Sequence, residues 1–319
     1  MSYKNVCVAG GGVLGSQIAF QAAYCGFDVT IWLRSEGSIG RTQPKIDHVR
    51  EEYVAAIEGM AAGTGEWCPG IADGDEPFDK QAALDAVERA YNSLKLELDL
   101  AVAVADADLV IESMAEDTQA KIEFYQKLAP VLPAKTVVVT NSSTLLPSTF
   151  AKYTGRPEKY LSLHFANSIW KNNMTEVMAQ AQTDKRYFDE LVEFATEIRM
   201  LALPVNKEKN GYLLNSMLVP WLLSGLDLYV SGVSDPKSID LAWTRGTGAP
   251  KGPFHVFDTV GIQTAYNIVM QYQKVPGLVN PLLKKMMMPY NFKAMAAVLK
   301  KMLDEGKLGE SSGEGFFKY

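Results

Sequence analysis

The sequence contains three histidines, and one of them, His164, stands where a reactive side chain is expected. His164 ends the apolar run 160–163, and the strands of open α/β sheets end at the edge where ligands bind. Glu176 follows twelve residues later, ahead of two apolar residues. A carboxylate bonded to one imidazole nitrogen fixes the tautomer and raises the basicity of the other nitrogen. The pair could therefore take the hydroxyl proton of an alcohol that loses hydride; a purely structural histidine is the alternative.

A glycine-rich segment near the start of the chain indicates a second kind of chemistry. Its residues are Gly10, Gly12, Val13, Leu14 and Gly15, and they lie between the strand-like run 6–9 and a helix-like segment. In this context Gly10 allows a tight turn, Gly12 lets the backbone approach a pyrophosphate, and Gly15 lets helix and strand pack closely. The helix N-terminus adds free N–H groups and a positive dipole end. The segment predicts a dinucleotide site, with an ordinary structural turn as the alternative.

The end of the next predicted strand bears on which dinucleotide is bound. Domains that bind NAD usually place Asp or Glu there, to bind the ribose 2′-hydroxyl. Here Arg34 and Ser35 follow the strand instead. A guanidinium can bond two oxygens of a 2′-phosphate, so we expect NADP in preference to NAD. Two alternatives are that Glu36 binds the hydroxyl from the loop and that Arg34 is only a solvated charge.

Short apolar runs alternate with amphipathic segments through the first 200 residues, which predicts an α/β domain. The runs are 6–9, 29–33, 109–112, 136–140 and 160–163, with helices such as 14–25 and 118–128 between them. This alternation is typical of a parallel, doubly wound sheet of the Rossmann type. Helical patterns alone follow, at 212–231, 236–245, 253–272 and 292–304. We therefore predict a dinucleotide-binding domain over residues 1–205 and a smaller all-α domain over residues 206–319.

Composition excludes several classes of protein. Hydrophobic residues make up 47% and charged residues 21%, which is typical of a globular chain, and the formal net charge of −6 disfavours nucleic acid as a partner. The most apolar long stretch, 212–233, is interrupted by polar residues and a proline, so no membrane span is expected. Three separated cysteines and the absence of a leader-like start favour the cytoplasm. No spacing indicates a metal site.

Several further motifs, in order along the chain, resemble the L-3-hydroxyacyl-CoA dehydrogenase family. They are the glycine loop, Thr140-Asn141-Ser142-Ser143-Thr144-Leu145, His164-Phe165-Ala166-Asn167 with Glu176, Asn210-Gly211-Tyr212-Leu213-Leu214-Asn215, the segment 248–254 and the ending 313–319. The resemblance implies that His164 is the general base or acid and that Glu176 orients it. It implies that Ser143 and Asn215 hydrogen-bond the substrate oxygens with support from Asn167, and that Glu116 and Asn141 lie on the cofactor side. Turn or capping roles are the alternatives for Ser143 and Asn215, and a structural role is the alternative for Glu116.

The chain departs from the family pattern where coenzyme A is held. Residues 59–79 contain five glycines and five acidic residues, with no Lys or Arg, and we expect a mobile surface loop there. The CoA nucleotide carries about four negative charges, so this loop would repel it; the alternative is that Lys45, Arg50 and Lys80 reach it. Ser168 replaces a common proline, and Ser216 replaces an arginine. The sequence also resembles a branch that includes CoA-independent diketoreductases.

Three functions therefore remain open. The first is hydride transfer between NAD(P) and C3 of a short 3-hydroxyacyl- or 3-oxoacyl-CoA. The second is the same chemistry on a CoA-free 3-oxo or 3,5-dioxo acid or ester. The third is a non-catalytic nucleotide-binding structural protein. The resemblance further implies a homodimer formed by the helical domains.

Overall fold

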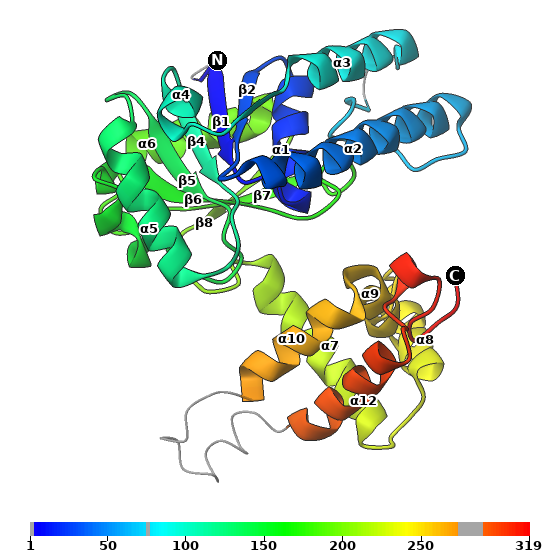
Figure 1. Ribbon diagram of the computed structural model, residues 1–319. Coiled ribbons are helices and arrows are strands. Elements are labelled where there is room, and N and C mark those ends of the chain that lie inside the picture. The colour runs from blue at the N-terminus through cyan, green and yellow to red at the C-terminus, as the bar shows by residue number, and fades with distance from the viewer. Residues whose placement is uncertain (1–2, 75–76, 274–289) are drawn as a thin grey trace. The chain divides into compact units, whose positions relative to one another are not determined.

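The computed structural model describes residues 3–74, 77–273 and 290–319. The chain divides into two compact units between Leu213 and Leu214, whereas the boundary predicted from the sequence lay after residue 205 (Figure 1). Each unit has its own hydrophobic core.

The first unit is built on a sheet of eight strands in the order β3-β2-β1-β4-β5-β6-β7-β8, counted over the described residues. Neighbouring strands are parallel except β6 and β7, which are antiparallel. The strands are β1 (Asn5–Ala9), β2 (Asp28–Trp32), β3 (Lys95–Glu97), β4 (Leu109–Glu112), β5 (Val137–Thr140), β6 (Tyr160–Phe165), β7 (Met174–Met178) and β8 (Leu201–Val205). The predicted doubly wound α/β fold is confirmed.

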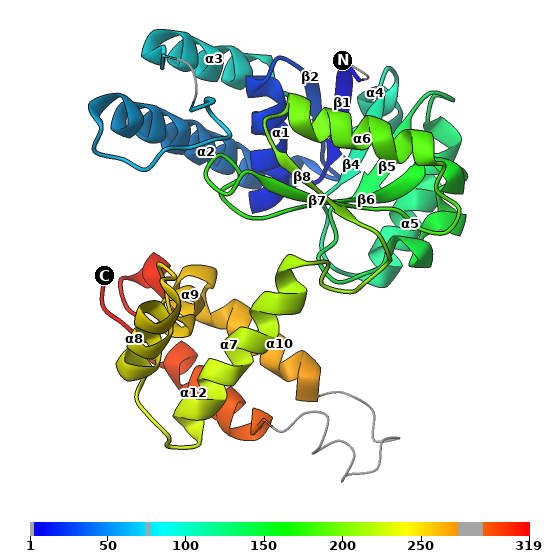
Figure 2. The ribbon, with the colours of Figure 1, turned by 180° about the vertical axis from the view of Figure 1, so that it is seen from behind.

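Helices cover both faces of this sheet (Figures 1 and 2). They are α1 (Val13–Tyr24), α2 (Glu36–Ala62), α3 (Lys80–Ser93), α4 (Leu100–Val104), α5 (Thr118–Leu128) and α6 (Lys185–Glu197). Alternate side chains of β1 point to opposite faces: Val6 and Val8 join the core that includes α1 and α6, and Cys7 joins the core that includes α4 and α5. Aspartate side chains cap the first turns of α3, α4, α5 and α6.

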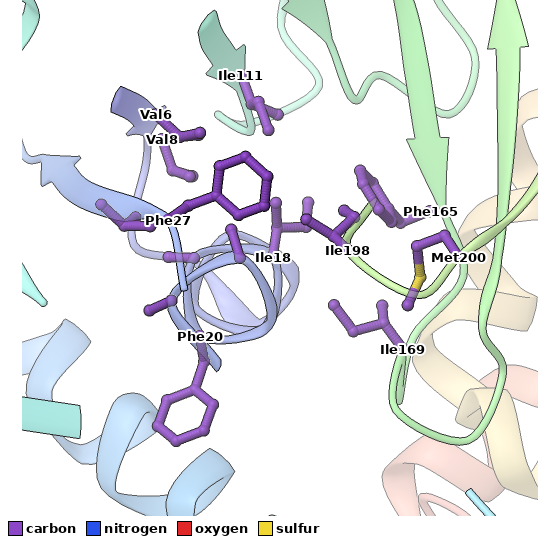
Figure 3. Close-up of a cluster of buried hydrophobic side chains, with 14 of the residues drawn as sticks. Val6, Val8, Ile18, Phe20, Phe27, Ile111, Phe165, Ile169, Ile198 and Met200 are labelled. Atoms are coloured by element: carbon purple, nitrogen blue, oxygen red, sulfur yellow. The ribbon is translucent and has the colours of Figure 1, made fainter. Parts of the chain in front are cut away.

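Helix α1 is fixed at the centre of the larger core, and this fixes the glycine loop in front of it. Ile18 packs among side chains from β1 and β4 and from two distant segments that carry Ile169 and Ile198 (Figure 3). All three isoleucines are fully buried. Burial of each such side chain is worth about 1.5–3 kcal/mol, so the helix and the segment after β6 are held in a defined position.

The acidic segment after α2 is anchored against the segment that follows β6. Cys68 and Ile71 are buried, and the Gly70 amide donates to the Trp170 carbonyl oxygen over 3.0 Å. A Cβ atom on Gly70 would lie 2.8 Å from the Trp170 backbone, so the two segments touch. The expectation of a mobile surface loop is corrected for residues 63–74, because buried apolar side chains and this backbone contact attach the segment to the core.

The second unit is helical, with α7 (Leu214–Val230), α8 (Pro236–Thr247), α9 (Pro253–Val260), α10 (Ile262–Gln273) and α12 (Phe292–Asp304). Its core includes Phe254, Phe257 and Leu299. The single helix predicted over 253–272 is wrong in one respect, because Gly261 with φ 88° separates α9 from α10. None of the helices in the described ranges is long and apolar enough to cross a membrane.

Candidate active site

His164 and Glu176 face each other across the antiparallel strands β6 and β7. The two residues are register partners, which explains why a spacing of twelve brings them together. The distance from His164 Nδ1 to Glu176 Oε2 is 2.8 Å. The histidine is 4% exposed and the glutamate is fully buried. When the carboxylate oxygen accepts a hydrogen bond from Nδ1–H, the neutral imidazole keeps its lone pair on Nε2.

The other imidazole nitrogen contacts Ser143, in the turn after β5. The distance from His164 Nε2 to Ser143 Oγ is 3.1 Å. Strands β5 and β6 are parallel neighbours, so the turn after one and the end of the other meet at the same edge of the sheet. An imidazole held by a carboxylate at one nitrogen, with a half-buried hydroxyl at the other, can exchange a proton with a substrate oxygen.

Glu116 holds the turn that carries Ser143. Its Oε1 atom accepts hydrogen bonds from Ser142 Oγ over 2.5 Å, from Thr144 N and Thr144 Oγ1 over 2.8 Å each, and from Leu145 N over 3.3 Å. Burial raises the pKa of the Glu116 carboxyl, but the hydrogen bonds from Ser142 and Thr144 outweigh burial and hold the pKa below its usual range. Glu116 therefore has a turn-forming role, which the sequence left open as a structural alternative.

Asn141 ties three strand ends together at this edge. Its Oδ1 atom accepts from the Phe165 amide at the end of β6 over 3.0 Å, and its Nδ2 atom donates to Ser113 Oγ, just after β4, over 3.3 Å. Asn141 itself follows β5 and is buried. Its side chain thus fixes the spacing between the turn with Ser143 and the strand with His164.

A buried ion pair lies beneath the same turn and was not found from the sequence. Glu112, the last residue of β4, accepts from Lys121 Nζ over 2.5 Å, and both side chains are at most 1% exposed. Its second oxygen accepts from Thr140 Oγ1 over 2.7 Å and from Tyr125 OH over 3.0 Å. The spacing of nine between Glu112 and Lys121 crosses a loop and has no sequence signature, so no pattern could have indicated the pair.

The backbone of the glycine loop has the geometry that binding of a dinucleotide pyrophosphate requires. Gly10 has φ 121°, and a Cβ there would lie 2.5 Å from the Ser113 carbonyl oxygen. A Cβ on Gly15 would collide with the Gly10 carbonyl oxygen. A Cβ on Gly12 would meet nothing within 4 Å, and no side chain caps the first N–H groups of α1, where Val13 is exposed and Leu14 half-buried. These open amides are the donors that a phosphate requires.

Arg34 and Ser35 are exposed between β2 and α2, where the adenosine ribose is bound in this fold. Ser35 Oγ is 3.0 Å from Ser38 Oγ, which also accepts from Arg41 Nη2 over 3.0 Å. Arg34 has no ion-pair partner among the residues that the structure describes. Two guanidinium groups and two hydroxyls therefore gather at the N-terminus of α2.

The two remaining predicted residues belong to other segments of the chain. Asn167 is exposed in the segment after β6, and its carbonyl oxygen accepts from Asn172 Nδ2 over 2.8 Å. Asn215 is half-buried in the first turn of α7, in the second unit. Within the first unit, the structure thus brings together His164, Glu176 and Ser143.

Comparisons with known proteins agree with the motifs. Residues 5–209 match the family model "3-hydroxyacyl-CoA dehydrogenase, NAD binding domain", and residues 211–319 match "3-hydroxyacyl-CoA dehydrogenase, C-terminal domain". The chain is 29% identical to the mitochondrial hydroxyacyl-coenzyme A dehydrogenase of Homo sapiens, over 99% of this chain and 91% of that protein. It is 27% identical to the 3-hydroxybutyryl-CoA dehydrogenase of Clostridioides difficile, over 88% of this chain and 93% of the relative.

A solved structure of a diketoreductase that acts on dicarbonyl compounds is more similar in sequence. It is 41% identical to this chain, with a TM-score of 0.79 and full coverage of both chains. The resemblance predicted from the sequence, including its diketoreductase branch, is confirmed. The chain belongs to the 3-hydroxyacyl-CoA dehydrogenase family of oxidoreductases.

Proposed function

We propose that the protein transfers hydride between NAD(P) and C3 of a short 3-hydroxyacyl- or 3-oxoacyl-CoA. The main support for this proposal is the position of His164, which is hydrogen-bonded to Glu176 and Ser143 at the strand ends of a dinucleotide-binding domain. Two of the relatives are named for substrates of this class.

Separate groups of residues would bind the parts of the cofactor. Gly10, Gly12, Val13, Leu14 and Gly15 would hold the pyrophosphate, and Arg34 and Ser35 the adenosine end, with Glu116 and Asn141 shaping the nicotinamide side. The bound nicotinamide supplies hydride in reduction and accepts it in oxidation.

His164 moves the proton that accompanies the hydride. In reduction its Nε2 atom donates a proton to the C3 oxygen, and in oxidation it takes the hydroxyl proton. The Glu176 carboxylate stabilises the imidazolium form from the Nδ1 side. Ser143 and Asn215 would hydrogen-bond the substrate oxygens, and Asn167 would support them.

A second candidate is the same reaction on a CoA-free 3-oxo or 3,5-dioxo acid or ester. The similarity to a diketoreductase favours it. The anchored acidic segment also favours it, because the nearby cations are already engaged: Arg199 pairs with Asp73 at 2.7 Å, and Lys171 lies 4.0 Å from Glu66.

One cation on α2 and one on α3 are engaged in the same way. Arg50 pairs with Glu88 at 2.5 Å, and Lys80 pairs with Glu58 at 2.6 Å. These two pairs leave Arg50 and Lys80 less available for the phosphates of CoA, although exposed pairs of this kind are weak and can be broken.

One experiment separates these readings. Initial rates of NADPH oxidation are measured with acetoacetyl-CoA and with a CoA-free 3-oxo ester at equal concentration. Faster turnover of the thioester supports the first function, and faster turnover of the ester supports the second. Failure of both substrates, with NADPH and with NADH, would contradict hydride transfer and leave a nucleotide-binding structural role.

We also infer NADP as the preferred coenzyme, because Arg34 and Arg41 are available for a 2′-phosphate and no carboxylate ends β2. For the compartment we propose the cytoplasm, on the basis of three free cysteines within the described ranges.

We further propose a homodimer formed through the helical unit. Leu228, Leu241 and Trp243 on α7 and α8 are exposed, at 42%, 46% and 39%. A cavity of about 470 Å³ beside them is lined mainly by apolar groups. Sedimentation velocity on Trp243→Glu should give a monomer where the unaltered protein gives a dimer; an unchanged dimer would exclude this face.

A further inference from the structure

The aromatic ring of Tyr212 lies flat against the imidazole of His164. The ring centroids are 4.5 Å apart and the ring planes differ by 14°. Tyr212 is 1% exposed, so the stack is enclosed by protein. One face of the imidazole is therefore covered by a single side chain, in addition to the two contacts that its nitrogens make in the ring plane.

The Tyr212 ring is itself fixed at its far end. Its hydroxyl donates to the carbonyl oxygen of Ser142 over 2.8 Å. Ser142 precedes Ser143, whose hydroxyl meets the other side of the same imidazole. Tyr212 thus links the histidine ring to the turn that carries the serine.

The backbone around Tyr212 contacts the carboxylate partner as well. The Leu213 amide donates to Glu176 Oε1 over 2.7 Å. The Tyr212 ring and the Leu213 amide reach these positions because Gly211 and Tyr212 adopt positive φ angles of 79° and 50°. A tyrosine in this region is under backbone strain, and such strain persists where surrounding contacts determine the conformation. Residues 211–213 therefore touch His164, Glu176 and the serine turn together.

The stacked Tyr212 ring restricts a tilt of the imidazole that the two hydrogen bonds do not prevent. Glu176 and Ser143 fix the imidazole within its own plane, but neither prevents a tilt about the Nδ1–Nε2 direction. When a substrate oxygen replaces Ser143 at Nε2, the bond to Glu176 alone would remain. A flat aromatic face at 4.5 Å blocks the tilt toward it.

We propose that Tyr212 is a positioning residue, which holds the His164 ring in the plane needed for proton transfer to and from the substrate oxygen. This inference rests on the proposed function. Tyr212 immediately precedes Leu213 and α7, so the segment that joins the two units also orients the general acid.

The test compares two substitutions that separate the ring from its hydroxyl. Tyr212→Leu removes the stack, and Tyr212→Phe keeps the stack but removes the bond to Ser142. Tyr187→Leu on α6 is the matched control, because that ring contacts only Lys159 and Arg186 among charged groups in the described chain. For each variant, kcat, the KM for NADPH, the solvent deuterium isotope effect on kcat and the Tm are measured with the better of the two substrates above.

Tyr212→Leu should lower kcat by about 10- to 100-fold, because small misplacements of a reacting group cost that much. Its KM for NADPH should stay within about twofold, and its solvent isotope effect should rise because proton transfer becomes slower. Tyr212→Phe should retain kcat within about fivefold. If Tyr212→Leu does not fold, Tyr212→Met serves the same comparison.

Two results would overturn the inference. One is a folded Tyr212→Leu or Tyr212→Met variant with unchanged kcat and isotope effect. The other is an equal loss of kcat in Tyr212→Phe, which would assign the role to the hydroxyl rather than to the stack. Absence of turnover in the unaltered protein would be a separate outcome, because it overturns the proposed function itself.

Discussion

Glu176 lies directly across the β6–β7 pair from His164, with its Oε2 atom 2.8 Å from Nδ1, and its other oxygen accepts the Leu213 amide over 2.7 Å. The carboxylate therefore has a defined orientation before any substrate binds. Its negative charge is buried, and it acts on the imidazole at short range.

Glu176→Gln should lower kcat by about 100-fold or more, because an amide can bond Nδ1 but cannot stabilise the imidazolium by charge. The Kd for NADPH should change by less than about twofold. Steady-state kinetics and fluorescence titration of the coenzyme measure the two quantities. Glu190→Gln on α6 is the control, and an unaltered kcat in Glu176→Gln would remove the carboxylate from the proposed mechanism.

The buried pair of Glu112 and Lys121 should contribute to stability rather than directly to chemistry. Lys121→Met leaves the Glu112 charge buried without its cation, so the free energy of unfolding should fall by about 3–5 kcal/mol. Lys121→Met combined with Glu112→Gln should regain much of that loss. Urea unfolding followed by circular dichroism gives the values.

Lys127→Met is the matched control for this pair, since Lys127 is exposed on the same helix. Its free energy of unfolding should change by less than about 0.5 kcal/mol. If Lys121→Met also changed the free energy of unfolding by less than about 0.5 kcal/mol, the Glu112–Lys121 pair would not contribute to stability as expected.

The hydrogen bonds to Glu116 make the serine turn sensitive to acid. Burial raises the pKa of its carboxyl, but the bonds from Ser142 and Thr144 bring the pKa below its usual value of 4.5. A lowered pKa in the folded state contributes stability above pH 4.5, and that contribution is lost as pH falls through the lower folded-state value. Glu116→Gln should therefore flatten part of the pH dependence of stability below pH 4.5.

Thermal unfolding between pH 3 and pH 7 is the measurement for this claim. The unaltered protein should lose more Tm than Glu116→Gln over the acid part of that range. Parallel curves of Tm against pH for the two proteins would show that folding does not lower the pKa of the Glu116 carboxyl.

Coenzyme preference should depend on Arg34. Arg34→Ala removes a guanidinium available to the 2′-phosphate, so the Kd for NADPH should rise by about 10-fold or more, while the Kd for NADH stays within about twofold. Isothermal titration measures both constants. Arg89→Ala, an exposed cation on α3, should alter neither. Equal effects of Arg34→Ala on the two coenzymes would contradict the NADP assignment.

The central strands were predictable from the sequence because they are almost uniformly apolar. All four residues of β4 and of β5 are buried, and short apolar runs of this kind are typical of the central strands of a parallel sheet. The edge strands were missed for the opposite reason. β3 reads Lys95-Leu96-Glu97, and β8 contains Pro204, so neither carries the pattern of a central strand.

The residues of the candidate site were predicted from the glycine spacing, from the position of His164 at a strand end and from the family resemblance, which named Ser143. Glu176 was named for its spacing of twelve residues from His164, and the antiparallel pair of β6 and β7, which was not predicted, explains that spacing. Lys121 and Tyr212 were missed as partners, because their contacts with Glu112 and His164 join segments that are brought together only by the packed fold. The acidic segment was misjudged because its composition conceals the buried Cys68 and Ile71.

The most direct test of the proposed mechanism is the turnover of His164→Ala with NADPH and the better carbonyl substrate, alongside the Kd for NADPH. Removal of a general acid and base should lower kcat by about 100- to 10,000-fold, and the coenzyme affinity should remain nearly unchanged. Normal turnover in this variant would contradict the account, because the proton would then be moved by another group.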